Sequence, residues 1–349
     1  MSYQSTLLTQ CEDLQDKLVN VFGKDGQMPN DPIPFLQFLR SEQNTNGVNM
    51  LVNPGEGKTK NVNLTYFQRL GESTVTEASE RGCDVGETRG NCVKQYTIDT
   101  TDLLQSSERI KASDLARFCE SNPQYLAEVI ARHMNVIDRR VATKTANEAA
   151  ALLGGYSADA VNFYGITNDI LTVSTKASNE YVIGAFERVS TAARMSSFNG
   201  FLSFGGAAMQ EYLNITLSGC CSNQGIDVRD IYDRFGYAFM YDRRLATALG
   251  SAANANLIME PGALQLLMYT ETPWKDGMQI EFNSGYAAFP FTTAAGVEVD
   301  VYIKDNCPGN VDINVFANTR LVGLPDDLFP VGDNFSGVNY VAQVNVSNS

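Results

Sequence analysis

The sequence is poor in the residue types and patterns on which many enzymes and nucleic-acid readers depend. Its 349 residues include one histidine, His133, and 26 basic residues against 40 acidic ones, which gives a formal net charge of −14. A single histidine excludes a multi-histidine metal site within one chain. The acidic balance argues against a nucleic-acid reader, which normally carries a basic patch. Acidic walls repel a phosphate polymer, so the chain can still enclose nucleic acid without gripping it.

Regular cysteine spacing and long apolar runs are also missing. The seven cysteines form no CxxC pair, and the N-terminus shows neither the basic region nor the apolar stretch of a signal peptide. An odd number of cysteines in a chain of this size favours free thiols in a reducing compartment. No run of about 18 apolar residues occurs, so no membrane partner is expected. The length predicts two or three folding units.

The first hundred residues predict extended appendages. Residues 5–22 have the apolar spacing of a short amphipathic helix, and the stretch that follows, to about residue 48, resembles an extended arm because it lacks regular pattern. Within residues 59–100, two alternating segments predict strands on either side of a polar tip, Gly71–Gly90. A tip of about 20 residues is unusual in a compact domain. Such a hairpin needs cover from a partner, and a neighbouring subunit is the natural source.

A long helix is the strongest signal in the sequence. Asn122 is a suitable N-cap, Pro123 suits the first helical position, and Gly154-Gly155 stop the pattern, which predicts a helix over 123–153. At 1.5 Å per residue this helix is about 46 Å long. The heptad pattern of a coiled coil is not sustained. We therefore expect a long helix lying across a sheet.

The remainder predicts mixed structure and an α+β fold class. A second amphipathic helix is expected over 178–197, capped by Ser178 or Asn179, and Glu260–Tyr269 is expected to be a turn followed by a short apolar helix. The expected strands are Tyr237–Tyr241, Ala255–Met259, Val297–Lys304 and Val311–Phe316.

This order of elements resembles the major capsid proteins of tailed bacteriophages, whose shell fold is named after phage HK97. Ile258–Leu266 is similar to the segment that closes the axial domain in that family, and Thr65–Arg69 with Cys83 resembles extended loops of some of its members. The resemblance implies an α+β, HK97-like capsid fold with an N-terminal arm, an extended hairpin loop, a long spine helix in a peripheral domain and a central axial domain. The implied ranges are 1–48 for the arm, 49–103 for the extended loop, 104–175 and 265–349 for the peripheral domain with spine helix 123–153, and 176–264 for the axial domain.

The same resemblance implies a structural function and no catalysis. The chain is expected to assemble with itself as hexamers and pentamers into an icosahedral shell around packaged double-stranded DNA. The other implied partners are a portal and a scaffold or decoration protein, and DNA contact is expected to be non-specific. The expected location is the virion, after assembly in the bacterial cytoplasm. Two alternatives stay open: an encapsulin-like protein compartment, and a soluble hydrolase with a carboxylate-based site.

Candidate chemical motifs favour structural interpretations, so no catalytic, cofactor-binding or metal-binding residue is assigned. Asn53–Thr59 ends like a phosphate-binding loop, but Val52 stands where that motif needs glycine, and a turn is expected. His133, inside the predicted long helix, is expected at a helix surface or a subunit contact, not in a catalytic triad. Free thiols are expected at Cys83 and Cys92, with a metal or disulfide as the less favoured reading.

The pairs of adjacent charged residues are also expected to have structural roles. The acidic pairs are those expected by chance among 40 carboxylates and are read as solvated surface: Glu12-Asp13, Asp326-Asp327 and Asp84/Glu87. Two basic pairs, Arg139-Arg140 and Arg243-Arg244, stand out in an acidic chain. Each is expected either to pair across a subunit interface or to form a salt bridge within the chain.

Overall fold

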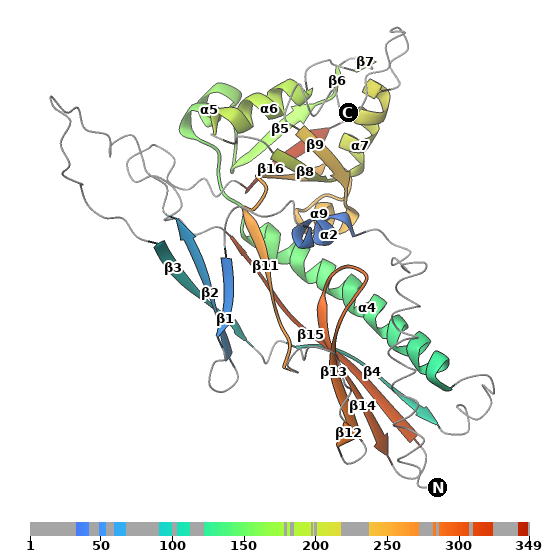
Figure 1. The fold of residues 1–349 in the computed structure, drawn as a ribbon. Coiled ribbons are helices and arrows are strands. Elements are labelled where there is room, and N and C mark those ends of the chain that lie inside the picture. Colours follow the sequence, from blue (N-terminus) through green and yellow to red (C-terminus); the bar gives the residue numbers. More distant parts are fainter. Residues whose placement is uncertain are drawn as a thin grey trace, which may run out of the picture.

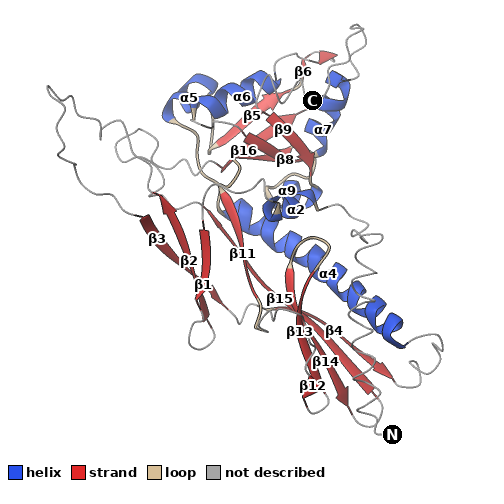
Figure 2. Cartoon of the chain, in the orientation of Figure 1, coloured by secondary structure: helices blue, strands red, loops and turns tan. Residues whose placement is uncertain are grey.

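The computed structural model confirms the prediction of mixed helices and sheets. It describes residues 33–41, 49–53, 59–67, 91–99, 103–111, 122–177, 180–181, 185–196, 198, 201–217, 237–271, 282–283, 286–306, 310–323 and 341–347. Figures 1 and 2 show two sheet-based units, with a long helix running along the lower one and reaching the upper one, and a separate small sheet beside them. The predicted helix over 5–22 lies outside the described residues.

Helix α4, Asn122–Ala151, is the predicted long helix, and it ends two residues earlier than expected. Its apolar stripe is buried as predicted at Leu126, Val129, Ile130, Met134, Ile137, Val141 and Ala149. The chain leaves the helix because the amide of Gly154 donates to the carbonyl of Val341, 2.8 Å away, which draws the chain toward strand β16, Val341–Ser347. The helix therefore lies across a sheet, as expected.

The sheet beneath α4 has the strand order β11-β15-β14-β13-β12, with β4 paired to β15. Its strands are β4 (Leu104–Lys111), β11 (Leu264–Tyr269), β12 (Phe282–Asn283), β13 (Tyr286–Thr292), β14 (Glu298–Asn306) and β15 (Asn310–Gly323). Side chains alternate along β15, where Val311, Ile313 and Val315 are buried while their neighbours are half-exposed. One face is thus apolar and covered by α4, and the other is polar. The predicted strands at Val297–Lys304 and Val311–Phe316 are confirmed as parts of β14 and β15.

The second sheet has the order β5-β16-β10-β8-β9. Its other strands are β5 (Ile170–Ser174), β8 (Phe201–Gly205), β9 (Tyr237–Tyr241) and β10 (Ala255–Met259), and its surrounding helices are α5 (Ala158–Tyr164), α6 (Ala185–Met195), α7 (Ala207–Leu217) and α9 (Arg243–Ala248). The predicted strands β9 and β10 are confirmed with the expected bounds. Strands β5 and β16 fall in ranges assigned to the peripheral domain, 104–175 and 265–349. Strand β16 pairs with both β5 and β10, so strands from the ranges expected for the peripheral and the axial domain share one sheet.

The predicted hairpin is confirmed, with one strand more than expected. Strands β2, Thr59–Phe67, and β3, Asn91–Asp99, are antiparallel with Val62 opposite Tyr96. A third strand, β1, Asn49–Asn53, pairs with β2. The segment read as a turn, Asn53–Thr59, therefore connects two antiparallel strands, whereas a phosphate-binding loop leads from a strand into a helix. The tip, Gly71–Gly90, lies outside the described residues.

Three local predictions are wrong. The range assigned to an extended arm contains helix α2, Pro34–Arg40, whose apolar side chains Phe35, Leu36, Phe38 and Leu39 are buried. The apolar helix expected within Glu260–Tyr269 is strand β11, which pairs with β15. A short apolar run fits either structure, and pairing decided it here. The helix expected over 178–197 begins only at Ala185, because Glu180–Tyr181 forms strand β7 against Lys176–Ala177, strand β6.

The burial pattern of α4 predicts a sharp contrast between two of its aliphatic residues. Ile130 is fully buried, whereas Val136 is 49% exposed. Ile130→Ala should lower the free energy of unfolding by about 2–5 kcal/mol, because it removes buried methyl groups and leaves a cavity. Val136→Ala, the matched control, should change it by less than about 0.5 kcal/mol. Urea denaturation measures both, and equal losses would contradict the assigned helix face.

Candidate functional site

Helix α2 is held at its N-terminal end by a buried carboxylate. Asp242, the N-cap of α9, accepts hydrogen bonds from the amides of Arg244 and Leu245, both at 3.0 Å. The same carboxylate accepts a bond from the amide of Phe35, 3.2 Å away, at the start of α2. Burial raises the pKa of Asp242, while these bonds and the charge of Arg244 lower it. One side chain thus caps two helices that are far apart in the sequence.

The C-terminal end of α2 is held by the turn between β13 and β14. Arg40 donates from Nε to the carbonyl of Gly296, 2.8 Å away. Gly296 has φ +80°, and a Cβ there would lie 3.2 Å from the Cβ of Arg40, so glycine suits both the turn and the close approach. Helix α2 therefore contacts both units. Asp242 belongs to the upper unit, built on the sheet β5-β16-β10-β8-β9, and Gly296 to the lower unit, built on the sheet covered by α4 (Figure 1).

The same turn is tied to α4 by Asp138, a fully buried carboxylate. Thr293 donates its hydroxyl to Asp138 at 2.5 Å, and the amide of Ala295 donates to it at 3.4 Å. Burial raises the pKa of Asp138 to about 6 from the ordinary value of 3.8, although both hydrogen bonds lower it. A raised carboxyl pKa is also found in general acids. Here the group has no exposed surface, so it acts as a structural tie between helix and turn.

His133 lies between α4 and β4, inside one chain. Its Nδ1 is 2.7 Å from the hydroxyl of Ser106 and its Nε2 is 3.2 Å from a carboxylate oxygen of Glu108. Arg132 approaches the same carboxylate at 3.9 Å. The side chain of His133 is 13% exposed. The predicted helix-surface or subunit-contact position is therefore wrong, since the ring is held between helix and strand of one chain. Its partners were missed because sequence spacing does not show where a helix crosses a strand.

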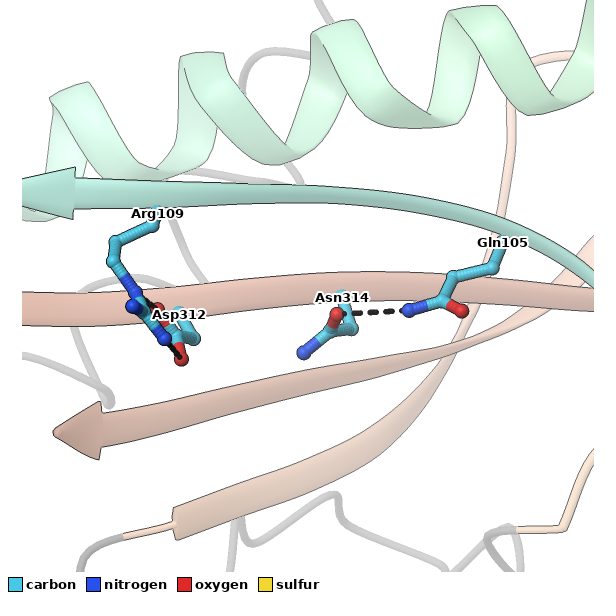
Figure 3. Close-up of polar contacts among 4 residues, drawn as sticks. All are labelled: Gln105, Arg109, Asp312 and Asn314. Carbon is cyan, nitrogen blue, oxygen red and sulfur yellow. Dashed lines mark hydrogen bonds and ion pairs between the residues drawn. The ribbon is translucent and has the colours of Figure 1, made fainter.

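The opposite face of the lower sheet carries a polar layer. Arg109 forms a two-pronged ion pair with Asp312, at 2.6 and 2.8 Å, and Gln105 donates to Asn314 at 3.1 Å. Figure 3 shows these side chains on the side of the sheet away from α4. Arg109 is largely exposed, so solvent screens the pair and it contributes little to stability. Its main effect is to keep this face hydrophilic.

The described side chains of the hairpin sheet contact the body at the base of the hairpin. Val62 and Ile98 are buried against Leu267 and Val322, in a cluster separate from the main core. Tyr96 donates its hydroxyl to the carbonyl of Gly323 at 3.2 Å, and Arg320 donates to the carbonyl of Thr97. These contacts fix the base of the hairpin next to β11 and β15.

The structure separates the two predicted basic pairs. Arg139 and Arg140 are both exposed on α4, and Arg139 donates only to the carbonyl of Asn135, one turn back. Neither has a carboxylate partner among the described residues. Arg243 and Arg244 open α9 instead, where Arg244 lies close enough to the capping carboxylate of Asp242 to lower its pKa. The remaining candidates lie outside the described side chains: Glu12-Asp13, Cys83, Asp84/Glu87, Cys92 and Asp326-Asp327.

The described part of the chain shows neither a metal-ligating cluster nor a helix that could span a membrane. Among those residues, no group of three or more His, Cys, Asp or Glu side chains is placed to hold a metal ion. None of the described helices is both long enough and apolar enough to span a bilayer.

Comparison with known proteins finds similarity in structure alone. No protein-family model matches the sequence, and no curated protein matches it. The chain is similar to a solved structure from Mycobacterium phage Adephagia, with 12% identity over 85% of this chain and 87% of that one, at a TM-score of 0.41. It is similar to the mature capsid of bacteriophage PhiM1, with 12% identity, coverages of 83% and 82% and a TM-score of 0.41. It is also similar to the capsid of cyanophage P-SCSP1u, with 12% identity, coverages of 85% and 86% and a TM-score of 0.40.

Two of these three solved structures are bacteriophage capsids, the class of protein that the sequence is expected to resemble.

The raised pKa of Asp138 predicts a pH-dependent stability. The folded state binds this proton more tightly than the unfolded state does, so proton binding stabilises the fold fully below about pH 4. That contribution is lost as the pH rises through about 6. In Asp138→Asn, which mimics the protonated form, the loss should be absent. The difference in unfolding free energy between variant and wild type should shift by about 3 kcal/mol in favour of the variant between pH 4 and pH 8. A pH-independent difference in urea denaturation would refute this assignment.

The shared cap at Asp242 predicts that two substitutions act differently. Asp242→Asn retains an oxygen for the amides of α9 but faces Phe35 with an amide donor, so it should release α2 alone. Hydrogen exchange in Phe35–Leu39 should become about fivefold faster, for a loss of about 1 kcal/mol. Asp242→Ala should speed exchange in both α2 and α9. Unchanged exchange of α2 in Asp242→Asn would count against the tether.

Proposed function

We propose that this chain is a shell-forming subunit of the bacteriophage capsid type. Many copies assemble as hexamers and pentamers into a closed icosahedral shell around double-stranded DNA. In this proposal α4 is the spine helix, the sheet it covers belongs to the peripheral domain, and β1–β3 form the base of the extended loop. The axial domain is built on the five-stranded sheet and so includes β5 and β16.

The observation that carries the proposal is the hairpin sheet. Among the described side chains, these strands of up to nine residues contact the body at their base, where Val62 and Ile98 pack on Leu267 and Val322 and Tyr96 and Arg320 form hydrogen bonds. A compact enzyme gains little stability from so extended an element. In a shell, a projecting sheet raises the contact area between copies, and obligate interfaces often bury about 2,000–5,000 Å².

The buried hydrogen bonds between elements support a structural role better than a catalytic one. The buried carboxylates of Asp138 and Asp242 accept hydrogen bonds from backbone amides and a hydroxyl. These bonds join α2, α4, α9 and the turn between β13 and β14. Buried polar groups with satisfied hydrogen bonds fix one arrangement of the elements around them. A subunit that must fit its neighbours needs that fixed geometry.

A soluble hydrolase is the alternative from another class, and Ser106, His133 and Glu108 are its best candidate site. Serine catalysis also needs donors that stabilise the oxyanion and a space for the substrate next to the hydroxyl. Ser106 lies on β4 beneath α4, with its hydroxyl 2.7 Å from Nδ1 of His133, so the cluster links the strand to the helix that covers it. We infer that this link is the role of the cluster.

The other proposed partners are a portal and a scaffold or decoration protein, and contact with DNA is proposed to be non-specific. The proposed location is the virion.

Deleting Glu72–Arg89 should separate folding from assembly. The wild-type chain should form hollow particles tens of nanometres wide, seen by negative-stain microscopy and size exclusion. The deletion variant should give soluble subunits with the same far-ultraviolet dichroism and an unfolding midpoint within about 4 °C of wild type, because the base of the hairpin is retained. Normal particles from the deletion variant, or a stable wild-type monomer under assembly conditions, would defeat the proposal.

A further inference from the structure

Two exposed apolar side chains stand out on opposite units of the chain. Phe163 on α5 is 71% exposed and Val136 on α4 is 49% exposed, the two highest values among the large apolar residues that the structure describes. Protein interfaces are enriched in aromatic residues and in arginine relative to the rest of the surface. Neither side chain belongs to the core of the unit that carries it, so folding does not explain them.

The surroundings of Val136 are basic. Arg132, Arg139 and Arg140 are exposed on the same side of α4, because 3.6 residues per turn place positions 132, 136, 139 and 140 on one face. The face extends for about 12 Å along the helix axis. We call these four residues the helix patch. Arginine and apolar side chains together are typical of protein interfaces, whereas a phosphate backbone needs no apolar contact.

Acidic residues lie on α5 and on the turn before β5. Asp159 stands four residues before Phe163 in α5 and so lies on the same face, and Asp169 is in the turn between Thr167 and Ile170, with its carboxylate beside Gly155. Both are exposed, and neither forms an ion pair with another described residue. Phe163 itself contacts Tyr164 edge-to-face, with ring centroids 4.8 Å apart, which restricts its orientation. We call Asp159, Phe163 and Asp169 the aromatic patch.

We propose that the aromatic patch of one copy binds the helix patch of a second copy of this chain. Each patch has an apolar centre with charges beside it, and the charges of the two patches are opposite in sign. The patches differ and lie on different units (Figure 1), so the contact is heterologous and builds rings or open chains instead of closed dimers. The inference deepens the proposed shell function and names two of its contact surfaces.

Charge-reversed variants test the contact by mixing. In R139E/R140E the helix patch becomes acidic like the aromatic patch. In D159K/D169N the aromatic patch becomes basic like the helix patch. Asparagine is used at 169 because Asp169 has φ +59°, a conformation that asparagine tolerates. Each variant alone should associate at least about tenfold more weakly than wild type, because like charges meet. An equimolar mixture should associate again, because each patch then finds its complement on the other variant.

The matched control reverses charges on the opposite face of the lower unit. K111E/K304E lowers the net charge by 4, as R139E/R140E does, since two residues change from +1 to −1 in each case. Lys111 and Lys304 are exposed on β4 and β14, away from α4. This variant should associate like wild type. Equal weakening in both variants would mean that net charge alone acts, and would overturn the proposal.

Substituting the aromatic anchor separates binding from folding. Phe163→Ala should weaken association by at least about tenfold while the unfolding free energy changes by less than about 1 kcal/mol. Analytical ultracentrifugation measures association of the full chain, and urea denaturation measures stability. Wild-type association of F163A, or a mixture that stays monomeric, would refute the contact.

The outcomes also separate this inference from the shell proposal. Restored association without closed particles supports the contact and counts against the shell. Closed wild-type particles, together with charge-reversed variants that assemble normally, support the shell and refute this contact. The helix patch could instead bind only nucleic acid. A salt-dependent gel shift that R139E/R140E abolishes, with no effect on association between copies, would refute the proposed contact.

Discussion

The rest of the structure depends on the packing of one long helix across one face of one sheet. The buried stripe of α4 and the inward side chains of β13, β14 and β15 form a continuous core. A single helix covers only one face of a sheet, so the opposite face has to be hydrophilic, as the Arg109–Asp312 pair and its neighbours make it. The outward face of α4 remains available for contacts, and it carries the helix patch. Burial on one side therefore determines what both outer surfaces can do.

Long periodic segments were predictable from the sequence, and contacts between distant segments were not. The apolar stripe and approximate length of α4, the strands β2, β3, β9 and β10, and the mixed fold class follow from local pattern and turn residues. Helix α2 was missed because its seven residues follow a proline-rich stretch, and its helical state depends on packing and on Asp242. Strand β11 was missed because Leu264–Tyr269 fits either period, and only its pairing with β15 selects the strand.

The candidate site shows the same limit more sharply. Asp138 is separated from Thr293 by 155 residues and Asp242 from Phe35 by 207, so no spacing rule brings these groups together. A polar residue on the buried side of a helix was the available signal, since Asp138 has no place in an apolar stripe unless a partner meets it. His133 is a similar case: Ser106 and Glu108 share one face of β4, but the crossing of α4 over β4 is a tertiary fact.

The tethers of α2 bear directly on how copies meet. The helix patch lies on the lower unit and the aromatic patch on the upper unit. The angle between the two units therefore determines how one copy is oriented relative to the next. Helix α2 binds the upper unit through Asp242 and the lower unit through Gly296, and Asp138 ties that same turn to α4. A heterologous contact closes into a ring only when the rotation per copy divides a full turn. The buried hydrogen bonds therefore do more than stabilise one chain: they fix the angle on which closure of the proposed assembly depends.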